Sequence, residues 1–494
     1  MTAFALLALA ALGTLAHGEE PVAEGVCPAV SPDGTRVAFH RFENGVMKVG
    51  VCPAAGGEVR WIESGPAMSA YPAWSPGGAL VYTYGQEKGT AYEVYKGLVK
   101  PEGYGLRVRE ANGAVRELCT GYTRDYLPSF SPDGKWVYFT TTREVKSPSK
   151  VYSLAMSANL ARIPLDGSGS PEVILKPKAQ YNTGLGQPVV SPDGRHLAYQ
   201  YMSSFNPDGW SVWVSRLDRL DIAASVRITP YLMTALAPRW HPNGRILGVT
   251  GCMPDGPGWG VWLVDTANFA VRRIADGENP SFSPDGKWVY YDRDRRIFRR
   301  PLSTADFPTA AEVVGDGEQD GVRRQGERTV WTNPGADKET VCDVSGDDYR
   351  VAPGDAIFVR AKVYWNGKDE MQMFFIGEYG ESDQGLILYL GKNRQLWFSS
   401  RDAHNRFAGV SCTLEKAGEY DLVGVRAGDC CHLSVNGGFP ISSGLSGSLP
   451  LLEPKVFRVG RGLKNGCAVR SVSFGRGWPK ELKTNADMRK EVFE

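Results

Sequence analysis

A short turn motif that recurs along the first two-thirds of the chain constrains the fold most. Its clearest copy is residues 131–134 (SPDG), and its copies begin at Ser31, Ser75, Ser131, Ser191, His241 and Ser283, which spaces them 44, 56, 60, 50 and 42 residues apart. Proline fixes φ at the second turn position, Asp or Asn accepts nearby backbone hydrogen bonds, and Gly takes the positive φ that closes a hairpin. Each copy therefore predicts a hairpin turn, and the turn aspartates are expected to be structural.

The residues on both sides of each turn read as strands. Side chains alternate in residues 136–139 (WVYF) and 288–291 (WVYY), and two further short strands are expected before the next turn. One four-stranded sheet cannot cover its own apolar faces, so repeats of this length are expected to stack around a channel. We predict an all-β chain whose residues 22–316 form a six-bladed β-propeller.

The closure of this ring is predicted without strand exchange. Each blade takes four consecutive strands, and residues 311–314 supply the last fourth strand. The sequence leaves open whether residues 322–331 help to close the ring.

The repeat also resembles a known family. The pattern Pro-x-(Phe/Trp)-Ser-Pro-Asp-Gly-(Lys/Arg)-x-apolar-x-(Phe/Tyr), clearest at residues 128–139 and 280–291, is similar to the TolB-type propeller repeat of TolB and of the propellers of some peptidases. The second copy departs at Gly77, and the fifth at His241 and Asn243, without loss of the turn chemistry. The resemblance implies a propeller that serves as a binding scaffold or accompanies an enzyme.

Beyond about residue 335 the turn motif is absent and longer strands are expected. We predict a linker at 317–338, a β-sandwich at 339–480 and a tail at 481–494. The closing strands, with the hairpin at 435–437 (VNG), resemble the laminin-G and concanavalin-A-like jelly roll. That resemblance implies glycan or protein binding, sometimes with calcium, and its most polar loop offers Arg401, Asp402, His404 and Asn405 as ligand-binding candidates.

The first residues indicate export. Residues 1–18 are apolar and end in small residues, as in a secretory signal peptide, although no Lys or Arg precedes the apolar run. The alternative is a short buried N-terminal segment. No later segment is long and apolar enough to cross a membrane, so we expect a periplasmic, extracellular or cell-surface protein.

Charge and motifs exclude several classes of function. The net charge is +1, from 56 basic and 55 acidic residues, which argues against nucleic-acid binding. The chain has six His, no HExxH motif, nine Cys without CxxC pairs, and no GxSxG elbow, so zinc enzymes and serine hydrolases are disfavoured. No cofactor is predicted, calcium is left open, and the metal content, cysteine pairing and oligomeric state are not set by the sequence.

In a propeller, the starts of the first strands and the connections after the second strands surround one mouth of the channel. Polar and aromatic groups there form the default ligand-binding face. We name as mouth residues Arg41, Tyr71, Arg124, Asp125, Tyr126, Arg143, Tyr181, Asn182, Asn279, Asp292 and Arg293.

Two functions remain open at this stage, beside a purely structural envelope protein that would show neither ligand binding nor turnover. The favoured one is an exported, non-catalytic binding protein whose propeller and second domain bind a protein or a glycan. The alternative is a carbohydrate-active enzyme, a polysaccharide hydrolase or lyase, with its site at the mouth; the 55 acidic residues could supply a carboxylate pair, but the sequence does not test their separation.

Overall fold

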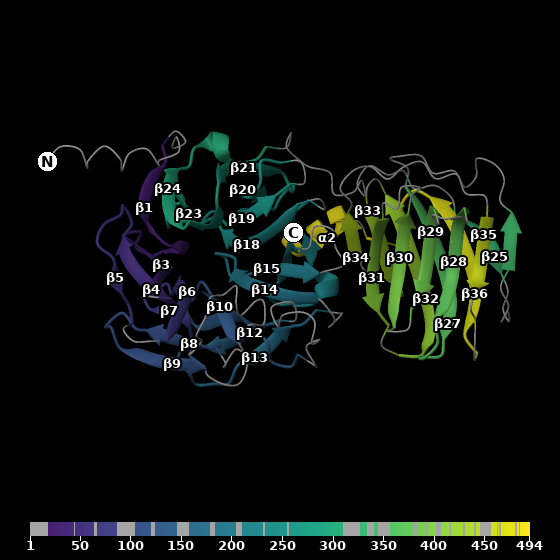
Figure 1. Ribbon diagram of the computed structural model, residues 1–494, viewed down its shortest axis with the longest axis horizontal. Helices are drawn as coiled ribbons and strands as arrows, with labels where there is room; N and C mark the ends of the chain where they lie inside the picture. The colour runs from purple at the N-terminus through teal and green to yellow at the C-terminus, as the bar shows by residue number, and fades with distance from the viewer. Residues whose placement is uncertain are drawn as a thin grey trace.

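The computed structural model shows a chain that is nearly all β, arranged as two bodies side by side (Figure 1). The structure describes residues 18–43, 45–63, 67–85, 104–119, 124–145, 158–177, 183–203, 210–230, 233–253, 256–309, 327–332, 340–343, 356–378, 384–391, 394–401, 407–414, 416–427, 430–438, 441–444, 456–461, 463, 466–479, 482–483 and 485–494.

The N-terminal body is a β-propeller. Its described residues form six antiparallel four-stranded sheets, which we number one to six from the sheet that begins with β2. Their first strands are β2 (Val26–Val30), β6 (Met68–Trp74), β10 (Asp125–Phe130), β14 (Thr183–Val190), β18 (Thr234–Trp240) and β22 (Glu278–Phe282). These strands contact one another in a closed cycle, from β2 to β6 and so on to β22 and back to β2.

The other strands follow outward in each sheet. The second strands are β3 (Arg36–Glu43), β7 (Leu80–Gly85), β11 (Trp136–Thr141), β15 (His196–Ser203), β19 (Ile246–Cys252) and β23 (Trp288–Arg293). The third strands are β4 (Val46–Pro53), β8 (Tyr104–Arg109), β12 (Asn159–Pro164), β16 (Trp210–Arg216), β20 (Gly260–Asp265) and β24 (Arg296–Pro301). The fourth strands are β5 (Arg60–Trp61), β9 (Val115–Cys119), β13 (Glu172–Leu175), β17 (Val226–Arg227), β21 (Val271–Asp276) and β1 (Glu20–Glu24), and two single 3-10 turns are η2 (Ile222–Ala224) and η3 (Thr304–Asp306).

The repeated motif forms the hairpin turns between first and second strands, as predicted. At residues 131–134, Ser131 Oγ donates to Asp133 Oδ1 at 2.6 Å, the same carboxylate accepts the Lys135 amide at 3.0 Å, and Gly134 has φ 68°. These hydrogen bonds lower the pKa of Asp133, as they lower that of Asp33 to about 2. The turn aspartates are therefore structural.

A second repeated feature lies within the first strands, directly before a proline. Cys27, Tyr71, Leu127, Gln187, Ala237 and Asn279 all have positive φ, between 49° and 55°, and the ladder register shifts at each of them. A bulged residue leaves the ladder, so its N–H group needs another acceptor.

In four places that acceptor is a side chain from the second strand of the preceding sheet, and we call this contact a seam bond. The donor–acceptor pairs are Cys27 N to Asp292 Oδ2 (2.8 Å), Tyr71 N to His40 Nδ1 (3.3 Å), Gln187 N to Thr140 Oγ1 (3.0 Å) and Asn279 N to Thr250 Oγ1 (2.7 Å). At Ala237 the amide instead donates to Gln187 Oε1 at 2.6 Å. The seam bonds stabilise the contact between neighbouring sheets.

The prediction of a ring without strand exchange is wrong. Strand β1, from the N-terminal side, pairs antiparallel with β24 and is the fourth strand of sheet six. Val22 of β1 packs with Ile297 of sheet six and with Val37 of sheet one. The predicted fourth strand at 311–314 lies outside the described residues. Strand exchange stabilises closure because it ties the two ends of the repeat array together.

The C-terminal body contains two antiparallel six-stranded sheets around one apolar core. The first, in spatial order, is β25 (Glu327–Thr332), β36 (Ala468–Arg476), β27 (Ile357–Trp365), β32 (Gly418–Ala427), β33 (Cys430–Val435) and β34 (Ile441–Gly444). The second is β26 (Thr340–Asp343), β35 (Val456–Arg461), β28 (Met371–Glu378), β29 (Gln384–Leu390), β30 (Gln395–Arg401) and β31 (Phe407–Thr413). Val359 and Leu422 of the first sheet pack with Leu388 and Phe398 of the second.

The predicted linker at 317–338 is corrected in part. Residues 327–332 are strand β25, which pairs with β36 at the edge of the C-terminal body. These residues therefore do not close the propeller ring, because their ladder partners lie in the other body.

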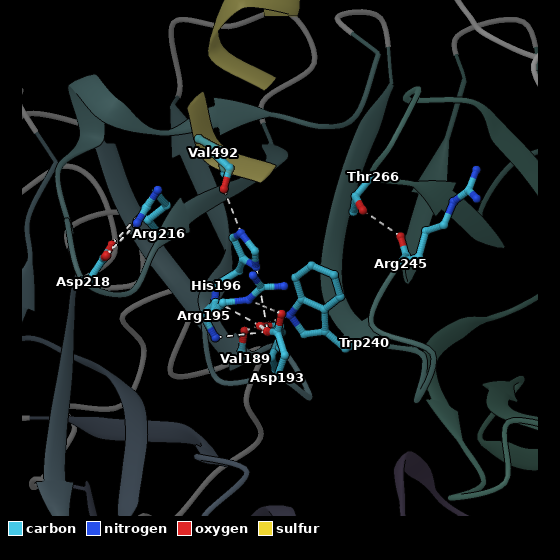
Figure 2. Close-up of polar contacts among 11 residues, drawn as sticks. Val189, Asp193, Arg195, His196, Arg216, Asp218, Trp240, Arg245, Thr266 and Val492 are labelled. Carbon is cyan, nitrogen blue, oxygen red and sulfur yellow. Dashed lines mark hydrogen bonds and ion pairs between the residues drawn. The ribbon is translucent and has the colours of Figure 1, made fainter. Parts of the chain in front are cut away.

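The predicted tail at 481–494 contains a helix that packs on the propeller. Helix α2 (Asn485–Phe493) buries Met488 and Val492 in the core shared by sheets four and five. The carbonyl of Val492, at the end of the helix, lies 2.7 Å from His196 Nε2, and Figure 2 shows the imidazole directed toward it. Arg489 lies over the Phe269 ring at 5.3 Å. The chain thus returns from the second body to the propeller (Figure 1).

In the part of the chain that the structure describes, no helix has the length and apolar character needed to span a membrane.

Candidate functional site

The described mouth residues lie where first strands begin and second strands end, away from the SPDG turns. Asp125 begins β10 and pairs with Thr141 at the end of β11, and Glu278 begins β22 and pairs with Asp292 near the end of β23. Tyr181 and Asn182 lie outside the described residues, as do Asp402, His404 and Asn405 of the second body. Arg401 ends β30.

Asp125 and Arg143 are brought together as a buried ion pair. The Asp125 side chain is fully buried, and Arg143 donates to it from Nε at 3.2 Å and from Nη2 at 2.6 Å. Thr141 Oγ1 donates to the same carboxylate at 2.7 Å. Both carboxylate oxygens therefore have partners, and the pair holds the chain after β11 against the start of β10.

Arg293 faces the closure of the ring. It donates to Glu19 from two nitrogens, at 3.1 and 3.0 Å, and Tyr291 Oη donates to the same carboxylate. The Glu19 side chain is only 1% exposed, and the Arg293 guanidinium lies 4.5 Å from the centre of the Phe298 ring. This group fixes the residue that precedes β1 against β23 and β24, so the role we find for Arg293 is structural.

Arg41 lies on β3 of sheet one, and Tyr71 lies at the seam between sheets one and two. Arg41 is 3.5 Å from Glu24, is hydrogen-bonded to Glu43 and lies 4.9 Å from the Trp61 ring centre. The Tyr71 ring meets the His40 imidazole edge-on at 4.9 Å. Burial lowers the pKa of His40 to about 4, so its neutral ring can accept the Tyr71 amide.

Arg124 and Tyr126 flank Asp125 on the same strand end. The Arg124 amide donates to Thr142 Oγ1 at 2.9 Å. Burial raises the pKa of Tyr126 to about 12, and the charge of Arg124 opposes that shift. The phenol is therefore protonated at neutral pH and is available as a hydrogen-bond donor.

Asn279 and Glu278 of β22, Asp292 of β23 and Cys27 of β2 are brought together where sheets six and one meet. Asp292 Oδ2 accepts the Cys27 amide at 2.8 Å and Asn279 Nδ2 at 3.0 Å. Glu278 pairs with Asp292 across the β22–β23 ladder. We call Cys27, Arg239, Glu278, Asn279 and Asp292 the closure cluster.

The closure cluster contains the most perturbed carboxyl of the mouth residues. Burial raises the pKa of Asp292 to about 7, and the neighbouring charge of Glu278 adds to the rise, whereas the two hydrogen bonds oppose it. Burial also raises the pKa of Glu278 and lowers that of Arg239. A carboxyl that titrates near neutral pH can hold or release a proton under physiological conditions, as a general acid or base must.

Three cluster members, Cys27, Arg239 and Glu278, are absent from the mouth residues named above. Burial raises the pKa of the Cys27 thiol well above its usual value, and the Asp292 charge adds to this while Arg239 opposes it. Arg239 Nη1 also donates to the Pro238 carbonyl at 2.8 Å. The prolines at 28 and 238 could have marked the positions of Cys27 and Arg239, because each of the six first-strand bulges precedes a proline.

Within the described ranges, no group of three or more His, Cys, Asp or Glu side chains is arranged to hold a metal ion. The closure cluster offers two carboxyls, a thiol, an amide and a guanidinium. Its chemistry is that of proton exchange and hydrogen bonding.

Comparison with known proteins finds partial likenesses. No family model matches the chain. It is 30% identical over 165 residues to an uncharacterized peptidase, YuxL, of Bacillus subtilis, covering 28% of this chain and 25% of that protein. It is 28% identical over 177 residues to an uncharacterized protein, Atu1656, of Agrobacterium fabrum, covering 34% of this chain and 50% of that protein. The chain thus spans a quarter and a half of the length of these relatives.

The chain also matches several solved structures, at low identity and low TM-score. TolB from Acinetobacter baumannii is 18% identical, with a TM-score of 0.36 and coverage of 56% of this chain and 54% of that one. Oligogalacturonate lyase from Vibrio parahaemolyticus is 11% identical, with a TM-score of 0.39 and coverage of 58% and 92%. Trypanosoma rangeli sialidase is 10% identical, with a TM-score of 0.35 and coverage of 96% and 94%. These matches do not distinguish a binding protein from an enzyme.

Proposed function

We propose that this chain is an exported, non-catalytic binding protein. In this proposal the six four-stranded sheets are the blades of a TolB-like propeller, whose mouth binds a protein or a glycan. The two six-stranded sheets are a laminin-G-like jelly roll that adds a second binding surface at residues 401–405. Residues 1–18 are a signal peptide that directs the protein to the periplasm, the extracellular space or the cell surface.

The observation that supports this proposal is that charged side chains at the mouth form ion pairs with other residues of the same chain. Asp125 is fully occupied by Arg143 and Thr141, and Arg293 is paired with Glu19. Such pairs stabilise strand ends instead of leaving a reactive carboxylate exposed. A mouth whose strand ends are held rigid in this way suits a scaffold that presents loops to a partner.

A glycan array combined with product analysis tests this function. We expect the purified full chain to bind a defined glycan or protein partner, with no change in the mass of the ligand after prolonged incubation. Asp285→Asn, at a turn on the opposite end of sheet six, is the control that keeps binding. A ligand that is converted to product would contradict the proposal.

The alternative function, a carbohydrate-active enzyme, is favoured by one observation. Glu278 and Asp292 pair across adjacent strands, both with raised pKa, and that of Asp292 is about 7. One of the pair could donate a proton at neutral pH while the other stays ionised. Turnover of a polysaccharide that Asp292→Asn abolishes, while the circular dichroism spectrum stays unchanged and the melting temperature does not fall, would establish this alternative.

A further inference from the structure

A cavity of about 400 Å³ opens between sheets one and two, away from the mouth. Its walls come from β3, β4 and β5 of sheet one, and from β6, β7 and the β8–β9 turn of sheet two. This end of the propeller carries the SPDG turns, so the cavity shares no residue with the closure cluster. We call it the rim cavity. A cavity of this volume suits a small ligand.

The floor of the rim cavity is apolar. Val51, Ile62 and Leu80 line it, together with Trp74, whose indole Nε1 donates to the Ala29 carbonyl at 3.0 Å. The indole is therefore fixed in place. Burial of the hydrocarbon part of a ligand against such a floor is favourable, because it removes apolar surface from water.

The rim of the cavity is cationic. Arg36, Arg60 and Arg109 line it against the two carboxylates Glu58 and Glu110. Glu110 is already engaged by Arg116 at 2.9 Å, outside the lining residues. The rim therefore has an excess of guanidinium charge.

The three guanidiniums differ in how firmly they are held. Arg109 Nη1 donates to the Ile62 carbonyl at 3.0 Å, which carries it across the seam from sheet two to sheet one. The Arg36 guanidinium lies over Trp74, 4.7 Å from the ring centre, and 3.8 Å from Asp33. Arg60 is exposed, and among the described residues no hydrogen bond or ion pair occupies its guanidinium.

We propose that the rim cavity binds a small organic acid: one carboxylate, held by Arg60 and Arg109, attached to an apolar planar body that rests on the floor. A guanidinium presents its N–H groups as a fork that matches the two oxygens of a carboxylate, so the geometry favours this anion. Fixed Arg109 positions the anion, and Arg60 closes on it from the exposed strand β5. This site does not depend on the proposed function of the mouth.

Binding of 2-naphthoate to the full chain, measured by isothermal titration calorimetry, tests the proposal. We expect 2-naphthoate to bind, and its neutral analogue 2-naphthylmethanol to bind at least about tenfold more weakly, because the alcohol lacks the charge-assisted hydrogen bonds. Affinity should also fall as salt is raised. Galacturonate, which carries the carboxylate on a polar ring, should bind more weakly than 2-naphthoate.

Two substitutions locate the site. Arg60→Gln should weaken 2-naphthoate binding about tenfold without loss of stability, because Arg60 is exposed. Arg109→Gln should weaken it as much, whereas Arg296→Gln, an exposed arginine on β24, should leave it unchanged. No binding at millimolar concentration, equal binding of acid and alcohol, binding unaffected by Arg60→Gln, or tighter binding of galacturonate would overturn the proposal.

Discussion

The seam between sheets six and one differs from the seam between sheets three and four, although both use the same backbone device. At the second of these seams, the neutral Thr140 hydroxyl accepts the bulged Gln187 amide at 3.0 Å. At the closure, the acceptor is the Asp292 carboxylate, and the buried Glu19–Arg293 pair lies nearby. The comparison teaches that the same backbone device can use a neutral hydroxyl or, as at the closure, a carboxyl group that titrates.

The largest effect should come from removing the buried anion at the closure. Glu19→Ala leaves Arg293 and Tyr291 without their shared partner, so we expect unfolding free energy to fall by about 3–5 kcal/mol. Glu20→Ala, on the neighbouring half-exposed residue that pairs with Arg299, should cost less than about 1 kcal/mol. If Glu19→Ala and Glu20→Ala lose the same unfolding free energy in urea, the buried Glu19–Arg293 pair stabilises the protein no more than a surface ion pair does.

Helix α2 covers the seam between sheets four and five, and a substitution there tests whether the helix contributes as much to stability as the closure does. Met488→Ala removes a buried side chain of α2 from the core of these sheets, and we expect a loss of about 2–4 kcal/mol. Lys490→Ala, on the exposed side of α2, is the matched control and should change little. If Met488→Ala is as mild as the control in thermal unfolding, α2 does not stabilise the propeller.

The charge of Asp292 predicts a pH dependence that the Thr140 seam should lack. The folded pKa of about 7 lies above the ordinary value of 3.8, so the folded state binds more protons between these values and stability falls as pH rises through that window. Asp292→Asn keeps an oxygen for the Cys27 amide and removes the titration. We expect it to gain about 2 kcal/mol relative to the wild type between pH 5 and pH 8.

Parallel denaturation curves at the two pH values provide the measurement. A constant difference between Asp292→Asn and the wild type would mean that Asp292 is ionised throughout this range when folded.

The smallest effect is expected at the neutral seam. Thr140→Val leaves the Gln187 amide without its acceptor and keeps the shape of the side chain, so we expect a loss of about 1–2 kcal/mol. Because no charge is removed, the loss should be the same at pH 5 and pH 8. A pH-dependent loss would erase the distinction between the two seams.

The turn chemistry of the propeller could be predicted from the sequence, because SPDG turns satisfy their hydrogen bonds within a few residues. The seam bonds could not, since Asp292 and Cys27 are far apart in the chain and only the proline after each bulge hints at them. Strand exchange was missed for the same reason: β1 has no motif of its own, and its partner β24 lies at the other end of the repeats. The sequence predicted Asp125 and Arg143 at the same mouth of the channel, but it could not show that they form an ion pair.

Hydrogen exchange of the β1 and β24 amides, followed by mass spectrometry, tests most directly whether the ring is closed through its N-terminal strand. We predict that peptides covering Glu20–Glu24 and Arg296–Pro301 are protected as strongly as those from the first strands of the other sheets, and that Glu19→Ala lowers their protection before any other. Exchange of Glu20–Glu24 at the rate of an unstructured peptide in the wild-type protein would contradict this closure.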